Sequence, residues 1–399
     1  MIQALDTVDL VVLAIAAGSL LATLALHWAV RRKLRAEDEP GVGGLPGISV
    51  LKPLCGVDEG LYENLVSFAE QAYPRFELLL GVEDPHDPAL AVAHRLHKAY
   101  PHVKIRVLVH GEHDPLANPK VITLIHLAAA ASHDLVLVSD SNVRAAATYL
   151  ASAAAAMSGE NVALVSNLIV GEGEDSLGAQ CENLHLNTFV LGGVCMADIA
   201  DKPCVVGKSM LMRRSQLATL GGFESLREVL AEDFLLGQRF HAAGYRVVLS
   251  RHAVATYNRR LPVRRFLARH LRWAQLRRTC ALGPFYCEAL LYTSPWLLLP
   301  MLVTANRNLS LLCMLGLCVR VANDGWMAKR ATGSWPAASA LLLLPLKDAL
   351  LLGVWSIAMF RRAVIWRGHE LRIGDGSRLI ASPAERMALL RERSAEVAS

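Results

Sequence analysis

Apolar residues follow three different patterns along the chain. An almost unbroken apolar run covers residues 8–30, and long apolar runs return between residues 289 and 360. Between them, from residue 48 onward, short apolar runs alternate with segments of helical spacing. The pattern predicts an N-terminal membrane helix, an α/β domain and a C-terminal membrane region.

The first apolar run has the length and flanks of a retained membrane anchor. Its 23 residues can span a bilayer core of roughly 30 Å at about 1.5 Å per residue. Asp6 and Asp9 precede the run and basic residues follow it, whereas a signal peptide carries its positive charge first. The basic residues are Arg31, Arg32, Lys33 and Arg35. The positive-inside bias then places the following residues in the cytoplasm.

The middle region alternates strand and helix signals after a glycine- and proline-rich linker at residues 37–47. Strands are expected at residues 48–51, 76–82, 104–109, 135–139 and 162–166, and helices at residues 61–71, 90–100, 121–132 and 148–157. This alternation indicates parallel strands in an α/β sheet that helices cover on both faces. Ligands bind beyond the carboxyl ends of such strands, so residues at those ends are candidates for a site.

Two aspartates follow strands of this kind. Asp140 comes directly after residues 135–139, where a carboxylate can bind a divalent cation that bridges a diphosphate. Asp84 follows residues 76–82, and its role would be to hold a uracil or ribose edge. Both residues also suit an Asx turn or a helix N-cap, so each has a structural alternative.

A second group of candidates consists of Glu232, Asp233 and Lys120. The two carboxylates precede a helix-like run at residues 234–243, and a carboxylate can take a proton from an alcohol. The alternative is that they complement the helix dipole. Lys120 can neutralise a phosphate or can be a solvated loop lysine, and Lys52 has the same two interpretations.

A basic helix is expected at residues 262–280. Its arginines can hold a phosphate leaving group through paired hydrogen bonds, and Arg269, Arg272 and Trp273 are the candidates there. The same amphipathic helix can also lie on anionic lipid head groups. An apolar region begins almost at once after this helix. It suggests that the alcohol from which a carboxylate would take a proton belongs to a lipid.

The region at residues 289–360 contains three apolar runs of unequal length. They cover residues 289–305, 309–322 and 334–360. The second is short for a membrane span, and the third contains Lys347 and Asp348, which suit either a lipid-access cavity or an exposed loop. Arginines after residue 360 favour a cytoplasmic tail at residues 361–399. Three simple spans would put that tail outside, so we expect one segment to be interfacial or re-entrant.

Composition narrows the class of protein. Charged residues make up only 19% of the chain, which is low for a soluble domain. The net charge of +5 suits an anionic lipid surface or a nucleotide, and no motif for docking on nucleic acid is present. The eight cysteines form neither a CxxC pair nor a zinc-type cluster with histidine, as expected for idle thiols in a reducing compartment.

Several short motifs then occur in a recognisable order. They are Ile48–Leu54, Gly56–Asp58, Tyr73–Pro74, Glu83–Asp84 with Asp87–Pro88, Asn118–Lys120, Asp140–Asn142, Gly207–Met210, Glu232–Asp233, Arg269–Trp273 and Trp366–Gly368. Each is weak alone, but the ordered set resembles the ceramide glucosyltransferases, the inverting glycosyltransferases of family 21. The resemblance is close from about residue 48 to residue 278.

The resemblance implies a fold and roles for particular residues. It implies a GT-A, Rossmann-like nucleotide-sugar domain at residues 48–280 that faces the cytosol. Asp84 would contact the nucleotide, Asp140 would act with Mg²⁺ or Mn²⁺ on the diphosphate, and Asp233 would be the general base. Arg269, Arg272 and Trp273 would match the (Q/R)xxRW motif near the diphosphate and acceptor. Asn142 stands where the usual DxD motif has its second aspartate.

The expected function is transfer of glucose from UDP-glucose to the primary hydroxyl of ceramide, with inversion, by a multi-pass protein of the bacterial inner membrane. Inversion needs in-line attack and one base, with no covalent intermediate. Transfer of N-acetylglucosamine to a hopanoid and transfer to a polyisoprenyl phosphate are alternatives. A membrane scaffold with an inactive domain is disfavoured because Asp140, Asp233 and Arg272 are all present.

Overall fold

The computed structural model describes residues 5–35, 44–114, 117–366, 369–381 and 387. Internal contacts divide the chain into two compact units. The sheet unit comprises residues 36–169, 200–257 and 363–399, and the helical unit comprises residues 1–35, 170–199 and 258–362.

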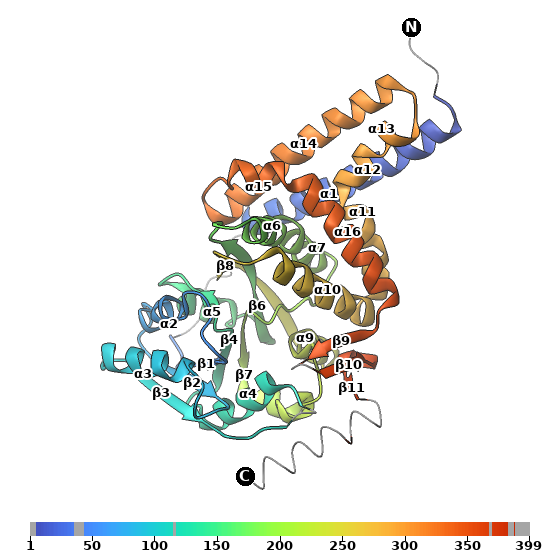
Figure 1. Cartoon of the computed structure of the whole chain (residues 1–399). Helices are drawn as coiled ribbons and strands as arrows, with labels where there is room; N and C mark the ends of the chain where they lie inside the picture. The colour runs from blue at the N-terminus through green and yellow to red at the C-terminus, as the bar shows by residue number, and fades with distance from the viewer. Residues whose placement is uncertain (1–4, 36–43, 115–116, 367–368, 382–386, 388–399) are drawn as a thin grey trace. The chain divides into compact units, whose positions relative to one another are not determined.

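The sheet unit is built on an eight-stranded sheet of order β3-β2-β1-β4-β7-β6-β8-β5 (Figure 1). Its strands are β1 (Ile48–Pro53), β2 (Phe76–Val82), β3 (Lys104–Val109), β4 (Leu135–Ser139), β5 (Val143–Arg144), β6 (Val162–Glu172), β7 (Ser209–Arg213) and β8 (Arg246–Tyr257). Its helices are α2 (Leu61–Ala69), α3 (Ala89–Ala99), α4 (Pro119–Ala130), α5 (Tyr149–Ala156), α8 (Arg214–Thr219) and α9 (Glu232–Ala242).

The apolar runs of the first four paired strands explain the core of this unit. Every residue of β4 is buried, as expected for a strand covered on both faces. Helix α4 packs closely on β2, because a Cβ atom on Gly81 would meet the Thr123 and Leu127 side chains at 2.7 and 2.9 Å. A glycine on β2 therefore brings the start of α4, which carries Lys120, close to the sheet.

The expectation of parallel pairing is correct for half of the sheet. Strands β3, β2, β1 and β4 pair in parallel, but β7 is antiparallel to β4 and β6 is antiparallel to β7. After Glu172, the last residue of β6, the chain continues through the helical unit as far as Ile199 before it returns to β7. No strand–helix–strand crossover therefore enforces parallel pairing at this point.

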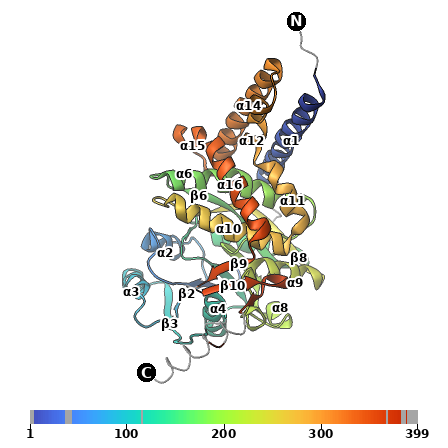
Figure 2. The same ribbon diagram turned by 45° about the vertical axis from the view of Figure 1, so that its right-hand side comes forward.

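The helical unit is mostly α-helical (Figure 2). It contains α1 (Thr7–Arg35), α6 (Leu177–His185), the π-helical turn η1 (Leu186–Val190), α7 (Leu191–Ile199), α10 (Val263–Cys280), α11 (Leu282–Leu291), α12 (Thr293–Leu298), α13 (Pro300–Val303), α14 (Arg307–Thr332), α15 (Ala338–Leu342) and α16 (Leu344–Phe360). Within the described residues, α1 and α14 are long and apolar enough to cross a membrane.

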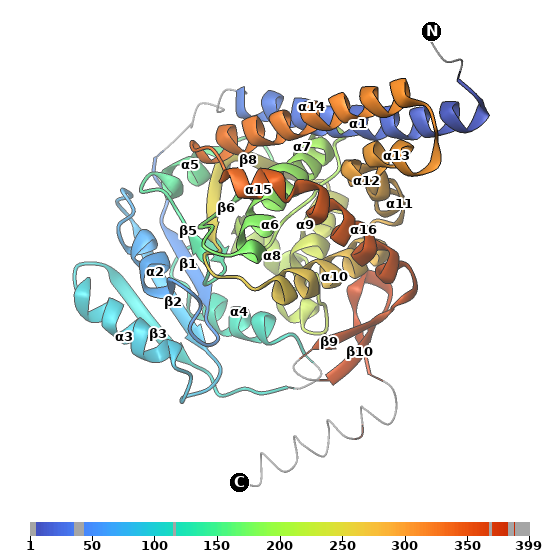
Figure 3. The same ribbon diagram turned by 45° about the horizontal axis from the view of Figure 1, so that its top comes forward.

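Helices α1 and α14 lie side by side and run in the same direction (Figure 3). At one end, Asn306 Nδ2 donates to Asp9 Oδ2 at 2.9 Å. At the other end, the Arg31 guanidinium lies 4.7 Å from the centroid of the Trp326 ring. The basic residues that follow both apolar stretches therefore gather at one end of the pair.

The C-terminal apolar runs differ from their expected form. The run at residues 289–305 is divided among α11, α12 and α13, and the run at 334–360 is divided into α15 and α16. The run at 309–322 was judged short for a span, but α14 continues for 26 residues. It passes through Arg320 because this side chain pairs with Asp324 at 3.0 Å, one helical turn later.

Lys347 and Asp348 do not form an exposed loop. Their side chains are 1% and 0% exposed, and they pair with each other at 2.7 Å. Asp348 Oδ2 also accepts hydrogen bonds from the Ser294 amide at 3.2 Å and its hydroxyl at 2.7 Å. Arg320 lies 3.8 Å from the same oxygen. Charges inside this apolar region thus face protein partners, which lowers the cost of burying them.

Part of the expected C-terminal tail belongs to the sheet unit. Strands β9 (Ala363–Trp366), β10 (His369–Ile373) and β11 (Leu379–Ile380) form a small antiparallel sheet. Ser377 O accepts the Leu230 amide at 3.0 Å and Ser377 Oγ accepts the Ala231 amide at 3.1 Å. These bonds hold the residues that precede α9. Residues 36–43 of the linker, Arg367 and Gly368 lie outside the described residues.

Candidate active site

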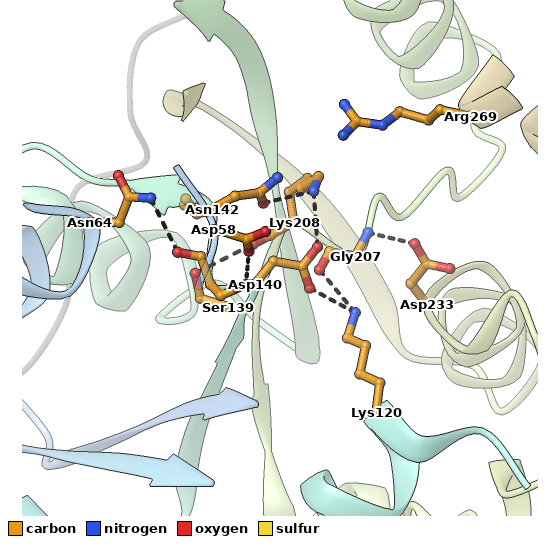
Figure 4. A network of polar contacts seen from close by, with 12 residues as sticks. Asp58, Asn64, Lys120, Ser139, Asp140, Asn142, Gly207, Lys208, Asp233 and Arg269 are labelled. Atoms are coloured by element: carbon orange, nitrogen blue, oxygen red, sulfur yellow. Dashed lines mark hydrogen bonds and ion pairs between the residues drawn. The ribbon is translucent and has the colours of Figure 1, made fainter. Parts of the chain in front are cut away.

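Asp140 lies between two lysines at the carboxyl end of β4 (Figure 4). Lys120 Nζ is 3.0 Å from its Oδ1, and Lys208 Nζ is 3.1 Å from its Oδ2. Burial alone would raise the pKa of Asp140, but the two ammonium groups hold this pKa well below its usual value. Asp140 is therefore a carboxylate at neutral pH.

Lys120 joins Asp140 to the start of α9. Its Nζ is also 2.8 Å from Glu232 Oε1. Burial opposes the charged lysine, but Asp140, Glu232 and Asp233 together raise its pKa above the usual value. Asn118 caps α4 by accepting the Lys120 amide at 3.0 Å, and its Nδ2 donates to Glu232 Oε2 at 3.3 Å. The Asn-Pro-Lys motif thus fixes two helix N-termini against each other.

Asp233 occupies the first turn of α9 beside Gly207 (Figure 4). Its Oδ2 accepts the Gly207 amide at 2.5 Å, and its Oδ1 accepts the Phe234 amide at 2.8 Å. A Cβ atom on residue 207 would lie 2.7 Å from Oδ2, so only glycine leaves room for this approach. Burial and the neighbouring Glu232 raise the pKa of Asp233 to about 6, although Lys120 opposes the rise.

The five side chains form one charge cluster. It comprises Lys120, Asp140, Lys208, Glu232 and Asp233, with three carboxylates against two ammonium groups. Burial and the excess negative charge together raise the pKa of Asp233, so its carboxyl binds a proton more readily than that of an ordinary aspartate. Four of the five residues were predicted from the sequence. Lys208 was noted only as part of a motif and had no predicted role.

Lys52 has neither of its two expected roles. Its side chain is fully buried, and Nζ donates to Ser139 Oγ at 3.1 Å and to Asp140 O at 2.9 Å. It also lies 3.6 Å from the centroid of the Phe68 ring. Burial drives its pKa well below the usual value, although Asp140 partly opposes this change. Lys52 therefore supports the turn that carries Asp140 rather than contacting solvent.

The Asp140–Asn142 turn is held at each of its three residues. Lys208 Nζ donates to Asn142 Oδ1 at 2.9 Å. Ser141 Oγ donates to Asp58 Oδ2 at 2.5 Å, and Ser141 O accepts from Asn64 Nδ2 at 3.2 Å. Asn142 thus preserves an oxygen at the position where a DxD motif has its second carboxylate.

Asp84 adopts its structural alternative. It is exposed in the turn after β2, and its Oδ1 accepts the His86 amide at 2.7 Å. Asp87 instead ties this loop to the neighbouring strand end, because its two oxygens accept the Gly56 amide at 3.0 and 2.9 Å. No contact among the described residues joins Asp84 to the charge cluster, and its nucleotide-binding role stays a prediction.

Arg269, Arg272 and Trp273 lie on α10 in the helical unit. Arg269 Nη1 donates to the buried Glu182 Oε1 at 2.7 Å, and His270 Nε2 is 2.8 Å from Glu182 Oε2. Burial would raise the pKa of Glu182, but His270 and Arg269 lower it to about 2. The centroids of the Trp273 and His270 rings are 5.3 Å apart, and the two rings are nearly perpendicular. The predicted role of these residues at a diphosphate stays a prediction.

Comparison with known proteins decides the family. A model of the family described as "Glycosyl transferase family 21" matches residues 10–379. The chain belongs to glycosyl transferase family 21. Ceramide glucosyltransferase 3 of Caenorhabditis elegans is 33% identical over 238 residues, which are 58% of this chain and 51% of that protein. Ceramide glucosyltransferase of Komagataella phaffii is 31% identical over 192 residues, 43% of this chain and 38% of that protein. The match thus spans about half the length of the first relative.

The fold of this family 21 protein also has a structural counterpart. The mannosyltransferase PcManGT of Pyrobaculum calidifontis, solved with GDP-Man and Mn²⁺, superposes with a TM-score of 0.51 over 88% of this chain and 99% of that chain. The two are 20% identical, so the likeness concerns the fold. It confirms the predicted α/β fold, which agrees with membership of glycosyl transferase family 21.

Asp140 and Asn142 offer oxygen atoms of the kind that bind a divalent metal, and Lys120 and Lys208 contact those same atoms. The described residues contain no group of three or more His, Cys, Asp and Glu side chains that could hold an ion alone. Mg²⁺ in nucleotide-dependent enzymes is held by one or two carboxylates and by phosphate oxygens. The ionised Asp140 and the Asn142 amide oxygen match that protein share of the ligands.

Proposed function

We propose that this protein transfers glucose from UDP-glucose to the primary hydroxyl of ceramide or a similar lipid, with inversion at the sugar. Family membership and the ceramide glucosyltransferase relatives support this proposal. We place the reaction at the cytoplasmic face of a bacterial inner membrane, because the basic residues Arg31 and Lys329 lie at the same end of α1 and α14.

The observation that carries the proposal is the state of Asp233. A general base works best when its pKa lies close to the working pH, and the pKa of Asp233 is raised to about 6. At neutral pH the carboxylate is mostly ionised and can accept the proton of an attacking hydroxyl. The backbone amides of Gly207 and Phe234 donate hydrogen bonds to this carboxylate and fix its orientation before the acceptor binds.

The other members of the charge cluster suit the leaving diphosphate. Asp140 and Asn142 would hold Mg²⁺ or Mn²⁺, which supplies positive charge to neutralise the developing negative charge on the diphosphate. Lys120 and Lys208 carry two ammonium groups to the same place. In this proposal Asp84 contacts the nucleotide, and Arg269 and Arg272 contact the diphosphate with Trp273 beside them.

The test is transfer of radiolabelled sugar by membranes that contain the protein. UDP-glucose and UDP-N-acetylglucosamine are each offered with ceramide or with bacteriohopanetetrol, with and without EDTA. The proposal predicts labelled glucosylceramide, and loss of the signal in EDTA if Asp140 works with a metal. If label moves only from UDP-N-acetylglucosamine to the hopanoid, both the proposed donor and the proposed acceptor are wrong. Transfer only to a polyisoprenyl phosphate contradicts the proposal.

A further inference from the structure

One ammonium group bridges the two oxygen atoms that the Asp140 turn offers to a cation. Lys208 Nζ lies 3.1 Å from Asp140 Oδ2 and donates to Asn142 Oδ1 at 2.9 Å (Figure 4). A divalent cation held by the same two atoms needs the position between them, at about 2.1 Å from each in the case of Mg²⁺. Lys208 Nζ and such a cation therefore cannot both bridge these oxygens at the same time.

The backbone of Lys208 cannot leave the turn, because β4 and β7 hold it there. Ser139 pairs with Ser209 across these strands. Lys208 O accepts hydrogen bonds from the Asp140 amide at 3.1 Å and from the Ser139 hydroxyl at 3.3 Å. The side chain has more freedom, because it is 15% exposed and its four-carbon stem is flexible. The ammonium can thus move only by a swing of the side chain about a fixed backbone.

Lys120 contacts the other oxygen of Asp140 and is less free to move. Its Nζ is 3.0 Å from Asp140 Oδ1 and 2.8 Å from Glu232 Oε1. The Glu232 side chain is only 7% exposed, so withdrawal of Lys120 would leave a buried carboxylate without this ammonium partner. The second partner of Lys208 is the uncharged Asn142 amide. Lys208 therefore leaves no unpaired charge behind once another cation takes its place on Asp140.

The charge of the cluster indicates which partner the displaced ammonium would take. Lys120 and Lys208 face three carboxylates, and a nucleotide diphosphate adds further negative charge. Lysine is a common point-charge partner of phosphate groups. Because Lys208 is fixed beside the oxygens that would hold the cation, its ammonium stays within reach of phosphates that share this cation. The displaced side chain gains a new anionic partner only when the nucleotide is present.

We propose that Lys208 couples metal binding to nucleotide binding. Without nucleotide, its ammonium competes with the divalent cation for the oxygens of Asp140 and Asn142. With a nucleotide diphosphate present, the ammonium yields these oxygens to the cation and binds the phosphates instead. The inference rests on the proposed function and deepens it, because it names a residue that makes the metal and the sugar nucleotide bind together.

The experiment measures Mn²⁺ binding to the full chain by electron paramagnetic resonance, in nanodiscs of zwitterionic lipid, without nucleotide and with saturating UDP. Asp140→Asn should lose the site and so measures Mn²⁺ that is bound elsewhere. In the wild type, UDP should strengthen Mn²⁺ binding about 10- to 100-fold. Without UDP, Lys208→Met should bind Mn²⁺ about 10-fold more tightly than the wild type, because the competing ammonium is gone. The strengthening by UDP should be about 10-fold smaller in this variant.

Two further variants serve as controls. Lys208→Arg keeps a cation at the same backbone position and should stay closer to the wild type than Lys208→Met does. Lys98→Met removes the same charge from an exposed position on α3 and should leave the affinities for Mn²⁺ and UDP unchanged. Equal strengthening by UDP in the wild type and in Lys208→Met would overturn the inference, because Lys208 would then only repel the cation. Mn²⁺ that binds the wild type no better with UDP than without it would also overturn it.

The binding assay separates this inference from the proposed function, because it needs neither a donor sugar nor a lipid acceptor. A smaller effect of UDP in Lys208→Met supports the coupling even if the wild type transfers no glucose to ceramide. An unchanged effect of UDP contradicts the coupling even if glucosylceramide is formed.

Discussion

Each unit of this protein encloses a group of charged side chains, and the two groups are built differently. In the sheet unit, Lys120 and Asp140 remain 24% and 25% exposed, and three carboxylates face two ammonium groups. In the helical unit the group is balanced, with two cations and two anions that are at most 3% exposed. Its members are Arg320, Asp324, Lys347 and Asp348.

The difference separates a chemical role from a structural one. A balanced, dry group leaves no charge to offer a substrate, but breaking it would leave an unpaired buried ion. An unbalanced and partly open group keeps a carboxylate whose pKa lies near neutrality, which is a feature of functional sites. Variants of the two groups should therefore fail in different ways.

The largest effect is expected for Asp233→Asn. Loss of the base should lower kcat by about 10²- to 10⁴-fold, while affinity for UDP-glucose stays close to that of the wild type. Radiolabel transfer measures kcat and calorimetry measures donor binding. Asp134→Asn, which changes a carboxylate at the opposite end of β4, is the matched control and should keep most of the activity. Wild-type turnover in Asp233→Asn would remove Asp233 from the mechanism.

In the helical unit, Arg320→Met should damage folding rather than chemistry. Leaving Asp324 and Asp348 without this cation should cost about 3–5 kcal/mol of stability, seen as a lower thermal midpoint and a lower yield of folded protein. The double variant Arg320→Met with Asp324→Leu removes both members of one pair and should recover part of the loss. A single variant that folds normally but is inactive would assign Arg320 a functional role instead.

A smaller effect is expected for Gly207→Ala. The added methyl group would lie 2.7 Å from Asp233 Oδ2 and must displace the carboxylate. Misplacing a base by a fraction of an ångström should lower kcat about 10- to 100-fold. Gly353→Ala on α16 is the control, because a Cβ atom there meets nothing within 4 Å. Equal activity of both variants would show that the contact between Gly207 and Asp233 is not needed.

The smallest effect concerns stability and pH. The folded-state pKa of Asp233, about 6, lies above that of an unfolded aspartate. The protonated carboxyl therefore stabilises the fold fully at low pH, and this stabilisation is lost as pH rises through 6. Asp233→Asn should therefore raise the thermal midpoint over the wild type more at pH 8 than at pH 5. The reverse order would mean that the native fold stabilises the ionised form.

Elements that are defined by residues close together in the sequence were predicted well, and elements that depend on distant residues were not. The bounds of β2, β3 and β4 were predicted to the residue, because short apolar runs ended by turn residues define them. The antiparallel β7 was missed because the long excursion before it has no local signature. Asp140, Lys120, Glu232 and Asp233 were found as residues that follow or precede regular elements.

What the sequence did not reveal is which partners each charge has. Lys52 was interpreted as either a phosphate-neutralising lysine or a solvated loop lysine. It is buried beside the Asp140 turn instead, and nothing near it in the sequence indicates its partners Phe68 and Ser139. Lys208 directly precedes β7 and pairs with Asp140, although it lies 68 residues later in the chain. The run at residues 309–322 was judged short for a span because Arg320 interrupts its end, and the pattern did not show that Asp324, one turn later, and Asp348, from another helix, both pair with Arg320.

The most direct test measures glucose transfer to ceramide from pH 5 to pH 8 in the wild type and in Glu232→Gln. If Asp233 is the base, kcat/KM for the wild type should fall as pH drops through about 6. Glu232 contributes to the raised pKa, so its neutralisation should move that fall to lower pH. A pH profile that Glu232→Gln leaves unchanged would contradict the assignment of Asp233 as the base.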